Sequence, residues 1–137
     1  MRVADLRART CCFTGHRDIP EAGREQLLER AETVVRELYS GKGVRFFGVG
    51  GAIGFDTIMA ELLFRLRESD LPDIKVILVY PFDGFPSRWS EAQKERYSVL
   101  LPQYDKVVRV GEHPSKYAYL ARDRHLVDGS AYCVAYC

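Results

Sequence analysis

Two kinds of apolar pattern alternate along this chain, and their alternation limits the folds that are open to it. Five short runs are apolar at nearly every position and rich in β-branched and aromatic residues, as is typical of strands covered on both faces. We predict these strands at residues 10–14, 44–49, 75–80, 106–110 and 131–136. Longer segments separate the runs, and in them apolar residues recur with the period of a helix.

The longer segments predict four helices, at residues 21–39, 55–67, 87–101 and about 115–127. The second shows the helical spacing best, with apolar side chains along one face: Phe55, Ile58, Met59, Leu62, Leu63 and Leu66. Strands that alternate with such helices form parallel sheets with helical crossovers. The sequence therefore predicts an α/β fold, a three-layer Rossmann-like sandwich around a parallel five-stranded sheet.

The strand order that we expect is 3-2-1-4-5, with the first strand in the centre. Ligands of open parallel sheets bind beyond the carboxyl ends of the strands, at the point where the strand order reverses. We therefore expect a crevice between strands one and four. The loops that follow the strands are the segments most suited to carry functional residues.

The size and charge of the chain narrow its class. Its 137 residues suffice for one domain, at residues 1–137, and its 47% apolar and 28% charged residues are those of a globular protein. The 20 basic residues nearly balance the 19 acidic ones, and a net charge of +1 argues against a nucleic-acid partner. No apolar run approaches the ~18 residues of a membrane helix, and the N-terminus lacks a signal-peptide core. We expect a cytoplasmic protein without a membrane partner.

The cysteines and histidines do not predict a metal site. The four cysteines, Cys11, Cys12, Cys133 and Cys137, form no C-x-x-C pair, and the three histidines lie far from them in sequence. Zinc sites usually show such spacing. We therefore expect reduced thiols, no metal ligand and no resident cofactor.

The loop after the second strand carries the strongest functional signal. Gly48, Gly50, Gly51 and Gly54 are four glycines within seven residues, directly before a predicted helix. Glycines let a ligand approach the backbone closely, and free N–H groups at a helix N-terminus favour a phosphate. The alternative is a tight turn that needs glycines only for packing. The loop matches neither G-x-x-x-x-G-K-[ST] nor G-x-G-x-x-G, which disfavours ordinary NAD binding.

The loop after the first strand offers a second group of candidates. Thr14, Gly15, His16 and Arg17 combine a hydroxyl, a flexible residue, an imidazole and a guanidinium group. His16 and Arg17 can hold a phosphate, and His16 can act as an acid or base. The alternative is a turn whose polar side chains face water.

Three further candidates stand at or beyond the predicted helix starts. Asp56 and Thr57 open the helix after the glycines. Asp56 either caps that helix or accepts hydrogen bonds from ribose hydroxyls. Trp89, the only tryptophan, either stacks on a base or packs its helix against the sheet.

Several short segments are informative when they are taken together. They are CFTGHR at 12–17, GGAIGFDT at 50–57, RWS and KERY at 88–90 and 94–97, and RDR and LVD at 122–124 and 126–128. In this order they resemble the YpsA-like branch of the SLOG superfamily, over nearly the whole chain. The resemblance implies a Rossmann-like domain that binds nucleotides or nucleotide-derived ligands. Its relatives include the cytokinin-activating phosphoribohydrolases and the DNA-processing protein DprA, and it implies no firm reaction for the YpsA-like branch.

The resemblance implies roles for individual residues where the motifs match. The residues implied to bind ligand are Thr14, Gly15, His16, Arg17, Gly50, Gly51, Gly54, Asp56 and Arg122. Asp123 stands where the family pattern usually has Asn. Relatives continue past the fifth strand into a Gly-Gly-Thr loop and a helix, where the phosphoribohydrolases carry a catalytic Glu. We expect this chain to lack that loop and helix.

Three functions are open at this point. The first is a module that binds or senses an ADP-ribose-like or other nucleotide ligand without turnover and has no catalytic residue. The second is a phosphoribohydrolase-like hydrolase of nucleotide N-glycosidic bonds, which needs a carboxylate at the sugar carbon; Asp56 is the available substitute. The third is a DprA-like binder of single-stranded DNA, which the near-zero net charge disfavours.

The candidate loops should converge on one pocket, because both leave the same end of the sheet. We expect N–H groups of residues 51–54 to hold a phosphate, Arg17 to neutralise it and Asp56 to take sugar hydroxyls. Gly51→Val should then block the approach of the ligand to the backbone.

We also expect a homodimer. A fifth strand without a covering helix would expose one of two sets of side chains: Ala131, Cys133 and Ala135, or Tyr132, Val134 and Tyr136. Exposed apolar surface of this kind is normally buried against a partner.

Overall fold

All five predicted strands are present, and they form one parallel sheet. The computed structural model describes residues 3–136; Met1, Arg2 and Cys137, one of the four thiols considered above, lie outside the described residues. The strands are β1 Thr10–Gly15, β2 Phe46–Val49, β3 Lys75–Tyr80, β4 Lys106–Arg109 and β5 Tyr132–Tyr136. Every neighbouring pair is parallel. The prediction of a Rossmann-like α/β fold is confirmed.

The predicted strand order is wrong in the placement of β4 and β5. The observed order is β4-β3-β2-β1-β5. β1 therefore lies between β2 and β5, and the point at which the strand order reverses lies between β1 and β5. β4 begins with Lys106 and ends with Arg109, and both side chains are exposed. A short strand with charged ends suits the edge of a sheet, where these side chains reach water. The expected crevice between strands one and four does not exist, because these strands are not neighbours.

The helices are α1 Val3–Ala8, α2 Arg24–Lys42, α3 Phe55–Glu68, α4 Glu91–Leu100 and α5 Lys116–Asp128. The short helix α1 was not predicted. The helix predicted at 87–101 is divided into a 3-10 turn, η1 Phe85–Arg88, and α4, because Trp89 has an extended backbone and Ser90 caps a new helix. No helix within residues 3–136 is long and apolar enough to cross a membrane.

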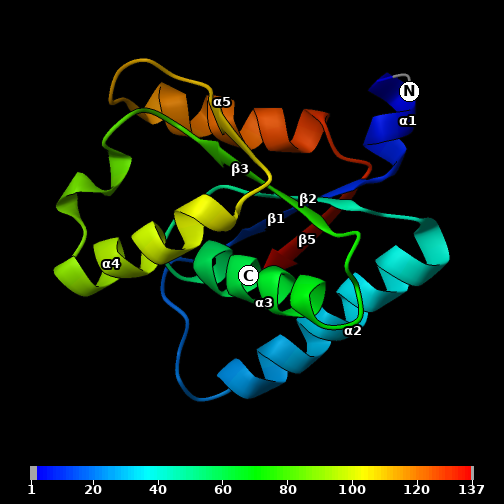
Figure 1. Ribbon diagram of the computed structural model, residues 1–137. Coiled ribbons are helices and arrows are strands. Elements are labelled where there is room, and N and C mark those ends of the chain that lie inside the picture. The colour runs from blue at the N-terminus through cyan, green and yellow to red at the C-terminus, as the bar shows by residue number, and fades with distance from the viewer. Residues whose placement is uncertain (1–2, 137) are drawn as a thin grey trace.

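Three helices cover one face of the sheet and α5 covers the other (Figure 1). Strands β1 to β4 lie side by side in chain order, so their three crossovers run in one direction. Right-handed crossovers in one direction place their helices on one face, and α2, α3 and α4 lie together there. The step from β4 to β5 runs the other way and puts α5 on the opposite face. The central helix α3 buries most of its length, including Met59 and Leu63.

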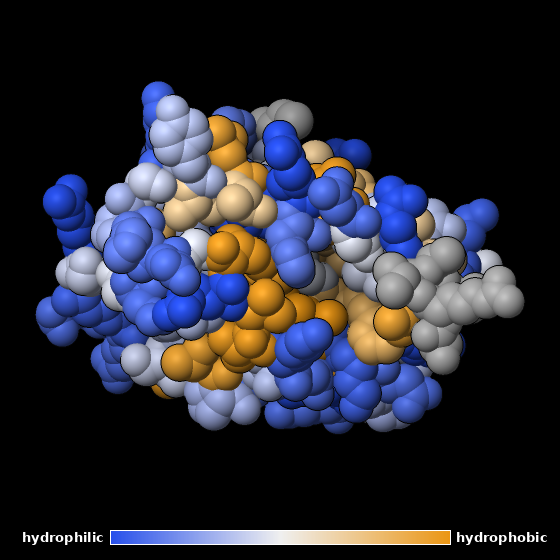
Figure 2. All heavy atoms as spheres, turned by 90° about the horizontal axis from the view of Figure 1, so that it is seen from above, coloured by the Kyte–Doolittle hydropathy of each residue, from blue (hydrophilic) through white to orange (hydrophobic). Residues whose placement is uncertain are grey.

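The face under α5 is covered less completely. α5 turns Ala118, Arg122 and Leu126 inward, and Val108 and Val110 of the neighbouring sheet edge are only partly buried. Large apolar side chains of α5 point outward and are exposed: Tyr117, Leu120 and Val127. Figure 2, seen from this side, shows an apolar area across the middle of the face.

Strand β5 also exposes part of its surface, as expected. Among the described residues no strand lies beside its outer edge; Cys133 and Ala135 are exposed, and Tyr132, Val134 and Tyr136 are half-buried. The first of the two alternative sets is therefore the exposed one. The homodimer that this exposure suggests stays a prediction.

The cap of α4 should contribute measurably to stability. The N–H group of Gln93 donates to Ser90 Oγ over 3.1 Å, and the N–H group of Ser90 donates to Gln93 Oε1 over 2.9 Å. Ser90→Ala should lower the free energy of unfolding by about 0.5–2 kcal/mol, measured by urea denaturation. Ser87→Ala, at an exposed position of η1, is the matched control. Equal losses in the two variants would contradict the role of the cap.

Candidate functional site

The loops after β1 and β2 meet at the start of α3. The N–H group of Phe55, the first residue of α3, donates to the carbonyl oxygen of His16 over 3.0 Å. Gly54 precedes it with a φ of 82°, and a Cβ atom there would overlap the backbone of Arg17. Only glycine combines this conformation with so close a neighbour. Gly54 therefore brings the two loops into direct contact.

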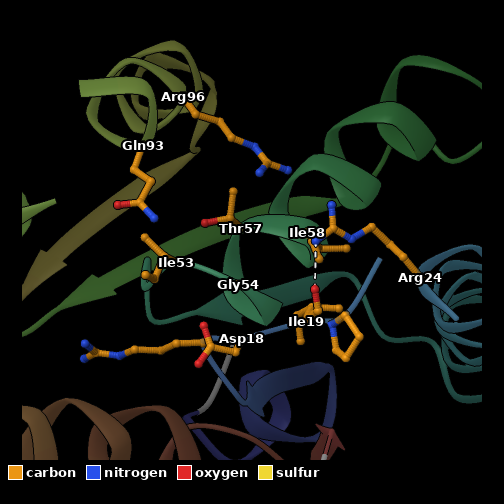
Figure 3. A pocket seen from close by; sticks show the side chains of 11 residues that line it. Asp18, Ile19, Arg24, Ile53, Gly54, Thr57, Ile58, Gln93 and Arg96 are labelled. Carbon is orange, nitrogen blue, oxygen red and sulfur yellow. Dashed lines mark hydrogen bonds between the residues drawn. The ribbon is translucent and has the colours of Figure 1, made fainter. Parts of the chain in front are cut away.

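A pocket of about 390 Å³ opens beside this contact (Figure 3). Residues 17–20 and Arg24 of α2 line one side, the start of α3 with Thr57 lies between, and Gln93 and Arg96 of α4 line the other side. Figure 3 shows Gln93 and Arg96 extending from α4 above Thr57, with Arg24 on the opposite side. Among the residues predicted from the sequence, Arg17, Gly54 and Thr57 line this pocket.

Arg24, Gln93 and Arg96 are pocket residues that were missed in the sequence. They lie within helices and outside the loop motifs, although Arg96 belongs to the KERY segment at 94–97 that contributes to the family resemblance. Gln93 and Arg96 are three residues apart on α4, a spacing that places them on one helix face. That spacing could have suggested a shared direction, but only the packing of α4 beside α3 brings them to the pocket.

Three guanidinium groups and one carboxylate, that of Asp18, line the pocket. Arg24 Nη1 lies 2.9 Å from Glu21 Oε1, and Arg24 Nη2 donates to the carbonyl oxygen of Ile19 over 3.0 Å, the dashed line in Figure 3. Arg24 Nε is buried and has no partner among the described residues. The lining of the pocket therefore carries an excess of positive charge and a donor without an acceptor.

The first turn of α3 adds backbone donors. The first N–H groups of a helix have no acceptor within the helix and form its positive end. The amide of Phe55 is used by His16, whereas the amides of Gly54, Asp56 and Thr57 donate no hydrogen bond among the described residues. A phosphate or carboxylate is the type of group that such amides bind.

Asp56 and Arg122 lie in a buried cluster that shapes the glycine loop and do not line the pocket. They are only 8% and 7% exposed. Arg122 Nη1 donates to the carbonyl oxygen of Gly50 over 2.7 Å, and Asp56 Oδ2 accepts the N–H group of Ala52 over 3.2 Å. Gly54, not Asp56, occupies the N-cap position. Arg122 thus connects the glycine loop to α5, and Asp56 stabilises the turn of that loop.

Burial changes the acidity of Asp56. Desolvation of its carboxylate raises the pKa from the usual 3.8 to about 6 and outweighs the Arg122 guanidinium and the Ala52 N–H group, which both lower the pKa. Asp56 is therefore a group whose charge changes just below neutral pH.

Tyr119 of α5 lies close to arginines of both parts of the site. The Cζ atom of Arg17 and the Cζ atom of Arg122 are each 5.7 Å from the centre of its ring. Guanidinium groups at this distance are attracted by the face of an aromatic ring. Tyr119 thus connects the loop after β1 with the arginine that fastens the glycine loop.

Other predicted residues of the first loop lie beside the pocket. Thr14 and Gly15 end β1 opposite Ala135 and Tyr136 of β5. The ring of His16 lies 6.2 Å from that of Tyr136, edge to face. These contacts direct the end of β1 toward β5 and away from α4.

Gly51 and Trp89, two further predicted residues, make packing contacts and do not line this pocket. Gly51 has a φ of 75°, and a Cβ atom there would lie 2.6 Å from Cδ1 of Leu78. Gly51→Val would therefore disturb the core, and it does not test ligand binding as the sequence suggested. The ring of Trp89 lies 5.3 Å from that of Phe85 and 5.6 Å from that of Tyr97, which agrees with the packing alternative.

The thiols do not form part of this site. Cys11 and Cys12 are buried, which raises the pKa of Cys11 to about 12 and that of Cys12 to about 11, and Cys133 is exposed and free. Within the described part of the chain, no group of three or more His, Cys, Asp or Glu side chains is placed to hold a metal ion.

The raised pKa of Asp56 predicts a pH-dependent stability. Between about pH 4 and pH 6 the folded state binds a proton at Asp56 that the unfolded chain has lost, so stability should fall as the pH rises through this window and then level off. Asp56→Asn keeps an acceptor for Ala52 and should remove this slope in urea unfolding at pH 4.5, 5.5 and 7. Asp128→Asn, at an exposed position, should keep it. A parallel profile for wild type and Asp56→Asn would show that Asp56 does not titrate there.

Comparison with known proteins agrees with the resemblance in the sequence. The family model YpsA, described as the YspA SLOG family, matches residues 24–136. A UPF0398 protein of Shouchella clausii is 29% identical over 84 residues, which cover 61% of this chain and 45% of that protein. The UPF0398 protein YpsA of Bacillus subtilis is 28% identical over 91 residues, which cover 65% of this chain and 50% of that protein. The chain thus spans about half the length of these curated relatives. Since the family model matches most of its residues, the chain belongs to the YpsA-type SLOG family.

Proposed function

We propose that the pocket beside α3 binds the phosphate-bearing part of a nucleotide or nucleotide-derived ligand, such as an ADP-ribose-like molecule, and that it does so without turnover. The observation that carries this proposal is that Arg17, Arg24 and Arg96, from one loop and two helices, line a single pocket together with Gly54 and Thr57, whose amides donate no hydrogen bond among the described residues. Guanidinium groups and helix N-termini are the two common donors to phosphate oxygens in proteins.

The remaining lining suits the less charged part of such a ligand. Ile19, Pro20, Ile53 and Ile58 provide apolar surface next to the arginines. Thr57 donates its hydroxyl hydrogen to the carbonyl oxygen of Ala52 over 2.9 Å, which leaves the hydroxyl oxygen as an acceptor. An apolar wall with a few polar groups is the usual composition of a small-molecule site.

The positions of the carboxylates near the pocket favour binding without turnover. A hydrolase of N-glycosidic bonds needs a carboxylate at the sugar carbon. Asp56, the substitute considered from the sequence, is buried and holds the loop. Asp18 is the carboxylate that lines the pocket, so a hydrolase would depend on it. Chromatography for released base, with wild type and Asp18→Asn, separates binding from hydrolysis.

The binding proposal is tested first with a panel of ligands. Melting temperatures with nucleosides, nucleoside mono- and diphosphates and ADP-ribose should rise only for the phosphorylated compounds. A titration with single-stranded DNA of mixed sequence should show no saturable binding. A rise with unphosphorylated nucleosides alone, or tight binding of the DNA, would contradict the proposal.

Arg17→Ala should weaken the best ligand of this panel by about tenfold to a hundredfold, because a charge-assisted hydrogen bond contributes roughly 1.5–3 kcal/mol. Isothermal titration calorimetry measures the effect. Arg65→Ala is the matched control, since Arg65 is an exposed arginine of α3 outside the pocket with one long ion pair of 3.5 Å to Glu32. Unchanged affinity in Arg17→Ala, or an equal loss in Arg65→Ala, would remove Arg17 from the site.

A further inference from the structure

We propose that Glu61 is a positioning residue that orients the guanidinium group of Arg96 for an anionic group of the ligand. This inference rests on the proposed function of the pocket. Glu61 lies on α3, nearly two turns after the helix begins, and it does not line the pocket. Arg96 lies on α4 and does line it.

The two side chains form a side-on ion pair. Arg96 Nε donates to Glu61 Oε2 over 2.8 Å, and Arg96 Nη2 donates to Glu61 Oε1. A guanidinium group has five N–H donors in a fixed plane. The side-on pair uses one hydrogen on Nε and one on Nη2. The end-on edge, with one hydrogen of Nη1 and the second hydrogen of Nη2, makes no hydrogen bond among the described residues, and it can form a bidentate contact with a phosphate or carboxylate.

The side chain of Arg96 extends in a direction that is consistent with two donors bound to Glu61 and the others free for a ligand. In Figure 3, Arg96 extends from α4 toward the region above Thr57, on the side of the pocket opposite Arg24. Glu61 approaches it from α3. The carboxylate therefore fixes the plane of the guanidinium group, and binding as proposed requires that the unused donors of this pocket-lining residue face the ligand.

The ion pair is not needed to attach α4 to the rest of the fold. Leu100 is buried, and the ring of Tyr97 packs against those of Phe85 and Trp89. The side chains of Arg96 and Glu61 are 46% and 38% exposed, and ion pairs with this exposure contribute little to stability. The main consequence of the ion pair between Glu61 and Arg96 is that it restricts the Arg96 side chain, which would otherwise sample many rotamers.

Glu61 also places a negative charge near the ligand, which opposes binding. That repulsion acts through solvent and weakens as salt is added, since the screening length is about 8 Å at physiological ionic strength. The orientation of Arg96 is a geometric effect and persists at higher salt. The two effects therefore have opposite signs and different salt dependences.

The experiment titrates inorganic phosphate and ADP-ribose into wild type, Glu61→Gln and the exchanged pair Glu61→Arg/Arg96→Glu. Each titration is made at 0.15 and 0.5 M salt, where the screening length is about 8 Å and about 4 Å. Glu61→Gln should bind about twofold to tenfold more weakly, the usual weight of ordering one long side chain, and the deficit should persist at the higher salt. Tighter binding by Glu61→Gln would overturn the inference, because Glu61 would then compete with the ligand.

The exchanged pair separates positioning from a structural role. It restores an ion pair between α3 and α4 but puts a carboxylate at the pocket wall. Its melting temperature should equal that of wild type, while its binding of phosphate should be lost, because the guanidinium group of Arg96 is replaced by a carboxylate. Binding restored to the wild-type level would show that only the ion pair between the helices matters, and would overturn the inference.

A measurement without ligand distinguishes this inference from the proposed function. The ¹H–¹⁵N signal of Arg96 Nε should be that of an ordered side chain in wild type and of a mobile one in Glu61→Gln. An ordered Arg96 in a wild-type protein that binds neither probe would refute the function of the pocket alone. A mobile Arg96 in a wild-type protein that binds phosphate would refute the role of Glu61 alone.

Discussion

The close approach of two backbone segments at Gly54 is the constraint on which the site depends. Gly54 lies against the backbone of Arg17, and the N–H group of Phe55 is tied to the carbonyl oxygen of His16. This contact sets the position of the first turn of α3 relative to the loop after β1. The amides of α3 and the arginines of residues 17–24 then border the same space. A side chain at position 54 would separate the two loops and open the site.

A buried polar cluster, with one residue from α3 and one from α5, supports this contact. Arg122 of α5 binds the carbonyl oxygen of Gly50, and Asp56 binds the amide of Ala52. Burying these charges is costly unless they are paired and hydrogen-bonded, and the raised pKa of Asp56 reflects that cost. The helix α5 is thus coupled to the glycine loop, although it lies on the opposite face from α3. The ligand site and both helical layers of the sandwich are connected through these few hydrogen bonds.

The sequence predicts the strands, the four longer helices and the converging loops, because each depends on local pattern: apolar runs, a helical stripe and a cluster of glycines. The order of the strands depends on long-range pairing, and the exposed Lys106 and Arg109 of β4 indicate an edge only in retrospect. For the same reason Arg24 and Arg96 were missed, since packing of α2 and α4 beside α3 brings them to the pocket. Asp56 was predicted as a ligand-binding residue, but it is buried beside the pocket and holds the glycine loop, and that burial has no local signature in the sequence.

The most direct test of the account is a titration of the ¹⁵N-labelled protein with ADP-ribose, followed by ¹H–¹⁵N correlation spectra. The account predicts that the largest shifts fall on the amides of Gly54 and Thr57 and on the side chains of Arg17 and Arg24, which border one pocket beside α3. Shifts concentrated instead along α2 and β5, around Leu27 and Val134, where a second pocket lies, would contradict it. Spectra that do not change at millimolar ligand would contradict it as well.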